Sequence, residues 1–365
     1  MKTIEDIQKL NIKAPNQEVF LKVKENWDSI SKPLDGLGDF ETIICKILSV
    51  LEDAKVSELK KALVIMCADN GIVSEGVSQC GQENTLLVAK LLGEGRSTAS
   101  TMAKFAGAQT YVYDVGINTS DKIPGVIDKK IAPGTKDFLL ESAMTSKEAL
   151  EAIEVGIEAV RLIKSKGVNI IATGEMGIGN TTTSTAVACA LLKLDPKLLT
   201  GRGAGLSDEG LGRKLRVIYE GLRKYSFDSY AQENINTIDA KFAFDVLCAL
   251  GGFDIAALCG VYIGGAIEGI PIVIDGFISA VAALLANLFV PGCNNFMVPS
   301  HSGREKGTRL CLDELGLEPF ILGDMALGEG TGALMLFPLL DMMLDFYNNA
   351  STFKQGGIDN YVRQK

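Results

Sequence analysis

The sequence predicts an α/β protein with a parallel sheet flanked by helices. From residue 62 onward, short apolar runs end in glycine or aspartate, and each is followed by a segment with helical periodicity. The runs are apolar throughout, as expected of strands that are buried on both faces. Hydrophobic residues make up 47% of the chain and charged residues 22%, which is typical of a globular protein and excludes extensive disorder.

The first fifty residues are predicted to be helical and to form an appendage to the sheet. Apolar residues recur at helical spacing over residues 4–10 and 20–30, and Pro33 with two following glycines then breaks the pattern. The predicted strands follow at 62–71, 109–116, 168–177, 270–277 and 295–299.

Several helices are predicted between and after these strands. Thr145 and Glu148 have the spacing of a capping box and open a helix that ends at Gly167. Residues 253–267 and 276–288 are apolar nearly all round, which fits helices that cover a sheet or lie in a subunit interface. A last helix is expected over residues 331–346, and the polar tail after Asn348 is expected to fray.

Composition excludes several function classes. The chain has one histidine, His301, which excludes a histidine-cluster zinc site, so we expect acid–base chemistry from carboxylates. With 36 Lys plus Arg against 45 Asp plus Glu, the net charge is −9, which disfavours nucleic-acid binding. Eight dispersed cysteines without a CxxC pair indicate free thiols in the cytoplasm. The longest apolar stretch, 277–290, is too short to span a membrane, and residues 1–15 lack a signal-peptide core.

The strongest candidate site is the glycine-rich stretch GEMGIGNTTT at residues 174–183, between a predicted strand and a predicted helix. Backbone N–H groups and the helix dipole make such a place an anion site. The spacing nearly matches the nucleotide-triphosphate loop, but Asn180 stands where the lysine belongs, and the third glycine of the dinucleotide fingerprint is missing. We therefore expect a single phosphate on a small ligand; the alternative is an ordinary strand-to-helix turn.

Further candidates lie at other glycine-rich places. Lys214 ends the stretch 200–214 and is either a phosphate partner or an exposed lysine on a solvated helix face. Glu329, between two glycines at a helix start, either stabilises that helix electrostatically or acts as a general base. Asp69 and Asp275 lie at the ends of predicted strands, where parallel sheets bind ligands, although aspartate before glycine or Asn-Gly is also a common turn former.

Together these motifs resemble the nicotinate-nucleotide:dimethylbenzimidazole phosphoribosyltransferase family of cobamide assembly. GEMGIGNTT and LGEGTGA are the specific motifs. The matching segments run in order along the chain: KPLDGLGDFE (32–41), ADNGIVSEGVS (68–78), GEMGIGNTTT (174–183), GRGAGLSDEGLGRK (201–214), GGFDIAALCG (251–260), IVIDGFISAVAAL (272–284) and LGEGTGA (327–333).

The resemblance implies transfer of the 5-phosphoribosyl group from nicotinate mononucleotide to a lower-ligand base, which is 5,6-dimethylbenzimidazole or a related azole or phenol. The products are nicotinate and α-ribazole 5′-phosphate. No metal or cofactor is expected, because the pyridinium leaving group is already cationic. The resemblance also implies a Rossmann-like domain over residues 51–330 and a small helical domain built from residues 1–50 and 331–365. A homodimer with sites near the interface is expected, with a heterodimer with a paralogue as the alternative.

The same resemblance assigns roles to residues. Glu329 is the base that removes the proton from the incoming azole nitrogen, and Gln82 borders the base pocket. We hypothesise that Glu175 supplies negative charge near the developing oxocarbenium ion. The remaining expected substrate-binding residues are Gly177, Ile178, Gly179, Asn180, Thr181, Lys214, Ser74, Met176, Leu327 and Asp275. His301 falls in a segment matched to a family motif, so it is expected near the site without being its base.

The chain departs from the family pattern where the family has an arginine and this chain has Ala326. Arg304, at a position that is usually small, is a candidate to replace that charge. Two other function classes stay open. The α/β alternation suggests a nicotinamide-dinucleotide-dependent dehydrogenase, and the lost arginine suggests a regulatory paralogue or subunit of a heterodimeric enzyme.

Overall fold

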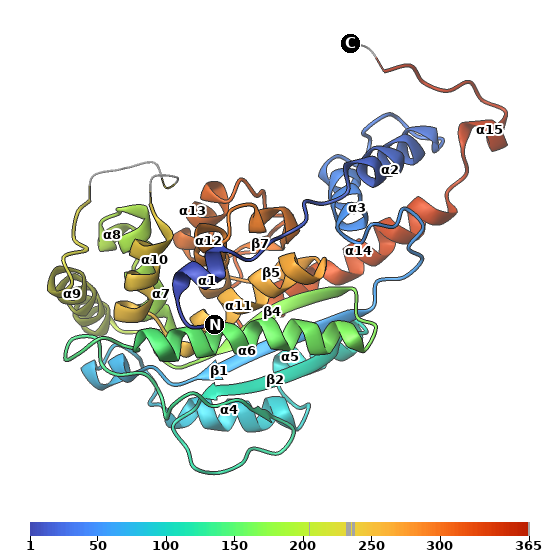
Figure 1. Cartoon of the computed structure of the whole chain (residues 1–365). Helices are drawn as coiled ribbons and strands as arrows, with labels where there is room; N and C mark the ends of the chain where they lie inside the picture. The colour runs from blue at the N-terminus through green and yellow to red at the C-terminus, as the bar shows by residue number, and fades with distance from the viewer. Residues whose placement is uncertain (204, 231–234, 236–237, 364–365) are drawn as a thin grey trace.

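The computed structural model describes residues 1–203, 205–230, 235 and 238–363 (Figure 1). Ala204 of the second glycine-rich stretch and the last two residues of the C-terminal segment lie outside the described residues. Six parallel strands form one sheet in the order β3-β2-β1-β4-β5-β6. Because the order reverses between β1 and β4, the crevice at their carboxyl ends is where such a sheet binds ligands.

All five predicted strands are present, and their bounds are β1 Lys61–Ala68, β2 Gln109–Gly116, β4 Ile170–Met176, β5 Ile272–Ile274 and β6 Met297–Pro299. The edge strand β3 (Ile127–Asp128) was not predicted, because two residues carry no periodicity. The same holds for a second, two-stranded parallel sheet formed by β7 (His301–Ser302) and β8 (Ile321–Leu322).

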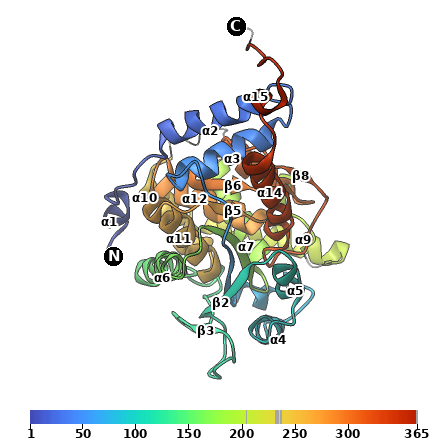
Figure 2. The ribbon, with the colours of Figure 1, turned by 90° about the vertical axis from the view of Figure 1, so that its right-hand side faces the viewer.

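Each face of the sheet has its own hydrophobic core, as strand alternation requires. Along β1, alternate residues belong to different cores: Ala62, Val64 and Met66 to one, and Leu63, Ile65 and Cys67 to the other. The first core lies under α6 (Ser146–Ser165), α7 (Asn180–Leu192), α9 (Asp208–Lys224), α10 (Ala240–Leu250), α11 (Phe253–Glu268) and α12 (Phe277–Phe289). The second lies under α3 (Asp39–Val50), α4 (Glu83–Gly93), α5 (Thr98–Phe105) and α14 (Thr331–Asn349) (Figure 2).

The predicted helices over this sheet are confirmed. The side chain of Thr145 accepts from the backbone of Glu148 in the predicted capping box of α6. The two all-apolar helices are α11 and α12, and both are buried within this chain. Helices α6 and α11 touch backbone to backbone, because an added Cβ at Gly156 or Gly260 would collide with the opposite helix.

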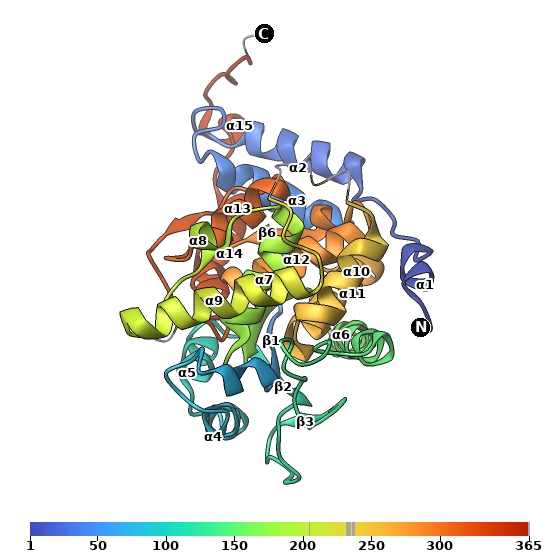
Figure 3. The same ribbon diagram turned by 90° about the vertical axis from the view of Figure 1, so that its left-hand side faces the viewer.

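The two chain ends meet at one end of the sheet. α2 (Gln17–Ser29) and α3 pack on α14, and Trp27 of α2 stacks on Phe346 with ring centroids 6.1 Å apart. In contrast, α1 (Ile4–Gln8) inserts its apolar residues at α10 and α12 (Figure 3). The tail after Asn348 contains α15 (Phe353–Gly356), so the prediction of fraying was wrong there: Thr352 caps this turn. The domain division at residues 50 and 330 stays a prediction.

The described chain also contains four short elements. They are the 3₁₀ turns η1 (Gly71–Glu75) and η3 (Cys293–Phe296) and the helices α8 (Pro196–Leu199) and α13 (Lys306–Glu314). No helix of the described part of the chain has the length and apolarity needed to cross a membrane.

Candidate active site

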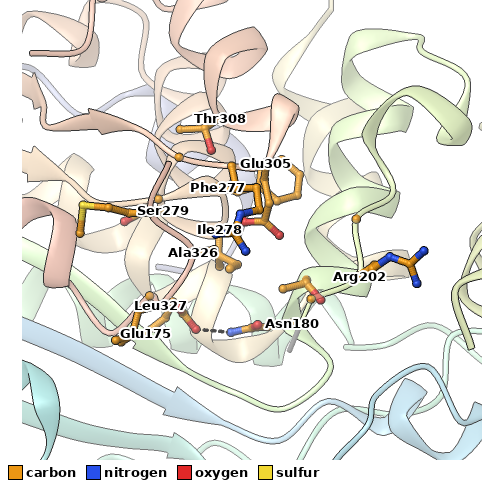
Figure 4. A pocket seen from close by; sticks show the side chains of 18 of the residues that line it. Glu175, Asn180, Arg202, Phe277, Ile278, Ser279, Glu305, Thr308, Ala326 and Leu327 are labelled. Atoms are coloured by element: carbon orange, nitrogen blue, oxygen red, sulfur yellow. Dashed lines mark hydrogen bonds between the residues drawn. The ribbon is translucent and has the colours of Figure 1, made fainter. Parts of the chain in front are cut away.

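A cavity of about 560 Å³ opens at the carboxyl end of the parallel sheet. Its wall is made by the segments that follow β4, β5 and β6, by the chain around α8, and by residues 325–331 before α14. The cavity therefore lies on the side of the sheet where the sequence motifs placed the chemistry. Figure 4 shows Glu175 and Asn180 hydrogen-bonded in this cavity, close to Leu327.

Most of the predicted site residues line this cavity: Glu175, Met176, Gly177, Ile178, Gly179, Asn180, Thr181, Asp275, Leu327 and Glu329. Ser74, Gln82 and Lys214 do not. The Ser74 hydroxyl donates to the Gly71 carbonyl at 2.8 Å, and the Gln82 amide donates to the Asn70 carbonyl at 3.1 Å. Both side chains thus support the turn after β1, next to the cavity wall.

Glu329 sits at the centre of a left-handed turn. Its φ is 57°, and the flanking Gly328 and Gly330 have φ of 84° and 85°. This conformation costs a non-glycine residue on the order of 1–3 kcal/mol and persists only where the surroundings hold it. The Glu329 Oε2 atom is buried and has no hydrogen-bond partner among the described residues. Burial raises the pKa of Glu329, the nearby Asp275 adds to that rise, and a hydrogen bond from the Ala99 backbone opposes it.

Asp275 holds this turn in place. Its carboxylate accepts hydrogen bonds from the backbone N–H groups of Gly330 (3.1 Å), Gly332 (2.8 Å) and Ala333 (3.1 Å). These are orphan donors at the N-terminus of α14, where a carboxylate is favourable. Asp275 thereby ties the Glu329 turn to the end of β5. That it also contacts a substrate stays a prediction.

Gly174 of β4 lets the Glu329 turn approach the sheet. A Cβ added at Gly174 would lie 2.7 Å from the Glu329 carbonyl carbon and 2.9 Å from the Gly330 nitrogen, which are backbone atoms that cannot rotate away. The two most specific motifs of the sequence therefore touch each other through a glycine that has no room for a side chain.

Replacing Gly174 by alanine is expected to push the Glu329 turn out of place. Overpacking of this kind costs about 1–3 kcal/mol of folding free energy, and a misplaced reactive group loses roughly 100-fold in rate. Gly212→Ala is the matched control, since an added Cβ there meets nothing within 4 Å on the exposed face of α9. Thermal unfolding and steady-state rates of both variants check this; equal behaviour of the two would contradict it.

Glu175, the residue before the last one of β4, is bridged to a second acid. The Asn180 side-chain amide donates both to Glu175 Oε2 and to Asp254 Oδ2, the latter at 3.0 Å. Burial raises the pKa of Glu175 to about 8, with further contributions from the charges of Asp254, Asp275 and Glu329, while the Asn180 hydrogen bond opposes the rise. Asn180, which replaces the lysine of nucleotide loops, is thus engaged with carboxylates.

Lys214 is buried, so its interpretation as an exposed lysine on a solvated helix face was wrong. It is 1% exposed, and its Nζ donates to the Thr181 hydroxyl at 2.8 Å. Gly203, with a φ of 53°, lies close enough that an added Cβ would sit 3.6 Å from this Nζ. Burial lowers the pKa of Lys214 to about 8, and the charge of Glu305 opposes that. The lysine reaches the cavity wall through Thr181, which is part of that wall.

Some backbone N–H groups of the glycine-rich loop after β4 donate hydrogen bonds to other groups of the protein. The Ile178 N–H donates to the Thr85 hydroxyl at 3.1 Å, and the Asn180 N–H donates to the Gly177 carbonyl at 3.0 Å. These two groups are therefore occupied within the protein. An added Cβ at Gly177 would lie 2.5 Å from the Ala68 carbonyl oxygen, so glycine is required where the loop passes β1.

Sequence reasoning missed two cavity residues at the start of α13. Glu305 and Thr308 both line the wall, and the buried Thr308 hydroxyl has no hydrogen-bond partner among the described residues. Burial raises the pKa of Glu305, while the charge of Lys214 lowers it. Their sequence signal is weak, because nothing in it shows that β6 and the short β7 turn this segment toward the cavity.

His301 and Arg304 lie at the cavity as well. The His301 ring is buried, lines the wall, and shares a hydrogen bond with the Ser300 hydroxyl at 2.9 Å. Arg304 lines the wall beside the segment that contains Ala326, since its backbone N–H donates to the Met325 carbonyl at 2.9 Å. Its guanidinium pairs with Asp324 at 3.3 Å. Replacement by Arg304 of the charge absent at Ala326 stays a prediction.

Known proteins resemble this chain over nearly its whole length. A family model described as "Phosphoribosyltransferase" matches residues 12–358. A nicotinate-nucleotide–dimethylbenzimidazole phosphoribosyltransferase of Acetivibrio thermocellus is 42% identical over 342 residues, covering 94% of each chain. An enzyme of the same name from Clostridium perfringens is 41% identical over 349 residues, covering 96% of this chain and 94% of that one.

A solved structure of similar fold also resembles this chain. A crystal structure described as CobT from Thermus thermophilus has a TM-score of 0.85 and 34% identity, covering 94% of this chain and all of that one. Neither alternative suggested by the sequence, a dehydrogenase or a regulatory paralogue, is favoured by these relatives. The chain therefore belongs to the nicotinate-nucleotide:dimethylbenzimidazole phosphoribosyltransferase family, as its motifs predicted.

Proposed function

We propose that this chain transfers the 5-phosphoribosyl group of nicotinate mononucleotide to 5,6-dimethylbenzimidazole or a related azole or phenol. Its membership of the family supports the reaction. The observation that carries the proposal is the buried Glu329 Oε2, an acceptor without a partner among the described residues, on the wall of a cavity large enough for a nucleotide and a base. A carboxylate in this state is suited to take a proton from a ligand.

The proposed reaction is a displacement at C1′ of the ribose that is assisted by two glutamates. The azole nitrogen attacks C1′ as the bond from C1′ to the pyridinium nitrogen breaks, and the electron pair of that bond stays on nicotinate. The azole N–H proton passes to Glu329. Attack opposite the leaving group inverts C1′ and gives the α-riboside. Positive charge that develops on the ribose is stabilised by ionised Glu175, which lies on the same wall.

The phosphate is assigned to the cationic side of the cavity. Lys214 supplies a buried positive charge behind Thr181, and the N-terminus of α7 supplies its dipole. A bound dianionic phosphate favours the charged form of this lysine. The nucleotide would thus lie between Lys214 and the two glutamates, with its glycosidic bond toward Glu175.

The kcat/KM for the nucleotide is expected to be bell-shaped in pH, with its maximum near pH 8. This ratio reports groups of the free enzyme. Glu175 has its pKa raised to about 8 and must lose its proton, so activity rises toward pH 8. Lys214 has its pKa lowered to about 8 and must keep its proton, so activity falls above pH 8. Initial rates across the pH range test this; a flat profile from about pH 6.5 to 9.5 would contradict both assignments.

Nicotinate release tests the reaction itself. The purified chain is incubated with nicotinate mononucleotide and, in parallel, 5,6-dimethylbenzimidazole, other azoles or phenols. Acceptor-dependent release of nicotinate is the expected result. A folded chain that turns over none of these acceptors would reject the proposed function.

We also propose a cytoplasmic homodimer, with a heterodimer with a paralogue as the alternative. Exposed apolar side chains on the packed helices α5 and α14 support an interface there, among them Phe105 at 86% and Met342 at 55% exposure. All eight cysteines are free, which fits a reducing compartment. Sedimentation of the purified chain measures the oligomer; a monomer at micromolar concentration would oppose the dimer.

A further inference from the structure

Asp254 is a buried acid that the proposed roles leave unused. It lies in the first turn of α11 and is 0% exposed. Its Oδ1 accepts from the Ile255 N–H at 3.0 Å, and its Oδ2 accepts from the Asn180 amide at 3.0 Å. Burying a carboxylate this completely is unfavourable unless the carboxylate is hydrogen-bonded or paired with a charge of opposite sign.

Two glycines make room for this carboxylate. A Cβ at Gly177, in the loop after β4, would lie 2.7 Å from Asp254 Oδ2. A Cβ at Gly252, just before α11, would collide with Asp254 Oδ1 and with the Asn70 side chain. The glycine-rich loop and the GGFD segment, far apart in sequence, are thus both shaped around Asp254.

The Asn180 side-chain amide links Asp254 to Glu175. Its NH₂ group contacts one oxygen of Asp254 and one oxygen of Glu175, so three elements meet at one nitrogen. The other Glu175 oxygen, Oε1, lies toward the Glu329 turn, since a Cβ at Gly328 would be 2.6 Å from it. The amide therefore holds Glu175 with one oxygen fixed and the other directed at the reactive turn.

We propose that Asp254 is a positioning residue of the phosphoribosyl transfer, which acts through Asn180 to orient Glu175 and to set its charge state. This inference rests on the proposed function for its consequence in catalysis, although the link between the three side chains is independent of it. Asp254 itself lies outside the cavity wall and does not contact the reacting atoms.

The charges around Glu175 come from several elements. Asp254 reaches it from α11, Asp275 from the end of β5 and Glu329 from the turn before α14, and each raises its pKa. Cys67 of β1 also lies among acids: burial first, and then the charges of Asp114, Glu175, Asp254 and Glu329, raise the pKa of that thiol. After burial, Asp254 is the largest of these influences on the pKa of Glu175, whereas Asn180 acts in the opposite direction.

Replacing Asp254 and replacing Asn180 should therefore shift the pKa of Glu175 in opposite directions. Asp254→Asn removes a like charge, so Glu175 should lose its proton at lower pH. Asn180→Ala removes a donor to the ionised form, so Glu175 should lose its proton at higher pH. A purely structural disturbance has no reason to move the titration in opposite directions in the two variants.

Infrared spectroscopy of the unliganded chain measures this directly. The protonated-carboxyl band that disappears in Glu175→Gln is titrated in the wild type, in Asp254→Asn and in Asn180→Ala. Asp114→Asn is the matched control, because Asp114 is also buried at a strand end but is held by Lys130 and by the Gly116 and Ile117 N–H groups. Its titration should coincide with that of the wild type.

The same variants are then compared in turnover. The acidic limb of the kcat/KM profile should move with the infrared midpoint, to lower pH in Asp254→Asn and to higher pH in Asn180→Ala. An unmoved midpoint in Asp254→Asn, or the same shift in Asp114→Asn, would overturn the inference. Should Asp254→Asn not fold, Asn180→Ala tests the contact through which Asp254 is proposed to act, and an unmoved midpoint there would overturn the inference. If the infrared midpoint moves in the variants as expected but the wild type shows no turnover, the proposed function is rejected. The link between the three side chains is then still supported.

Discussion

Glu329→Gln is expected to lower turnover with azole acceptors by roughly 10²–10⁴-fold, because the amide cannot take the azole proton. Nucleotide binding should be retained, since the side chain keeps its size and its place in the turn. Burial raises the pKa of Glu329, so its charge is unfavourable in the folded state, and the neutral variant should be at least as stable as the wild type. Rates, calorimetric binding and thermal unfolding measure the three effects.

An acceptor that is already ionised gives the sharpest control for this variant. An azole acidic enough to lose its N–H proton at the assay pH needs no base, so Glu329→Gln should lose much less activity with it. An equal loss with both kinds of acceptor would mean that Glu329 does not act as the base. An unchanged rate with 5,6-dimethylbenzimidazole would mean the same.

Lys214→Met is expected to raise the KM for the nucleotide by roughly 10–100-fold, which corresponds to the loss of about 1.5–3 kcal/mol from a charge-assisted contact. The kcat should change less, because the phosphate is far from the bond that breaks. Burial lowers the pKa of Lys214, so the buried charge is costly, and the methionine variant should unfold at the same or a higher temperature.

Lys224→Met is the matched control for the lysine variant. Lys224 lies on the same helix, α9, and is exposed, with its Nζ bonded to the Leu139 carbonyl at 2.8 Å. Its kinetics should match the wild type. A Lys214→Met variant with wild-type KM would place the phosphate elsewhere in the cavity, whose wall also holds the cations Lys197, Arg202, Arg304 and Lys306.

Local sequence patterns predicted the elements whose signals are themselves local. Hydrophobic periodicity, together with the residues that start or end an element, correctly predicted three features. They are the capping box at Thr145, the apolar strands and the fully apolar helices α11 and α12. The short strands β3, β7 and β8 were missed, because two residues are too few for a pattern and their pairing depends on the chain around them.

The candidate site was predictable in its residues but not in their contacts. Glu175 and Glu329, which the sequence motifs singled out, both line the same cavity. Nothing in the sequence indicated that Asp275 would cap α14 or that Lys214 would be buried behind Thr181. The link from Asp254 through Asn180 to Glu175 joins segments 74 residues apart, and only the packing of α11 against the sheet brings them together.

The products of one reaction distinguish transfer to a base from hydrolysis of the nucleotide. The chain is incubated with nicotinate mononucleotide and 5,6-dimethylbenzimidazole, and the products are separated and their anomeric configuration is read by proton NMR. Transfer to the base yields nicotinate and α-ribazole 5′-phosphate in equal amounts, with the new glycosidic bond in the α configuration. Ribose 5-phosphate in place of the riboside, or a β-configured product, would contradict transfer to a base activated by Glu329.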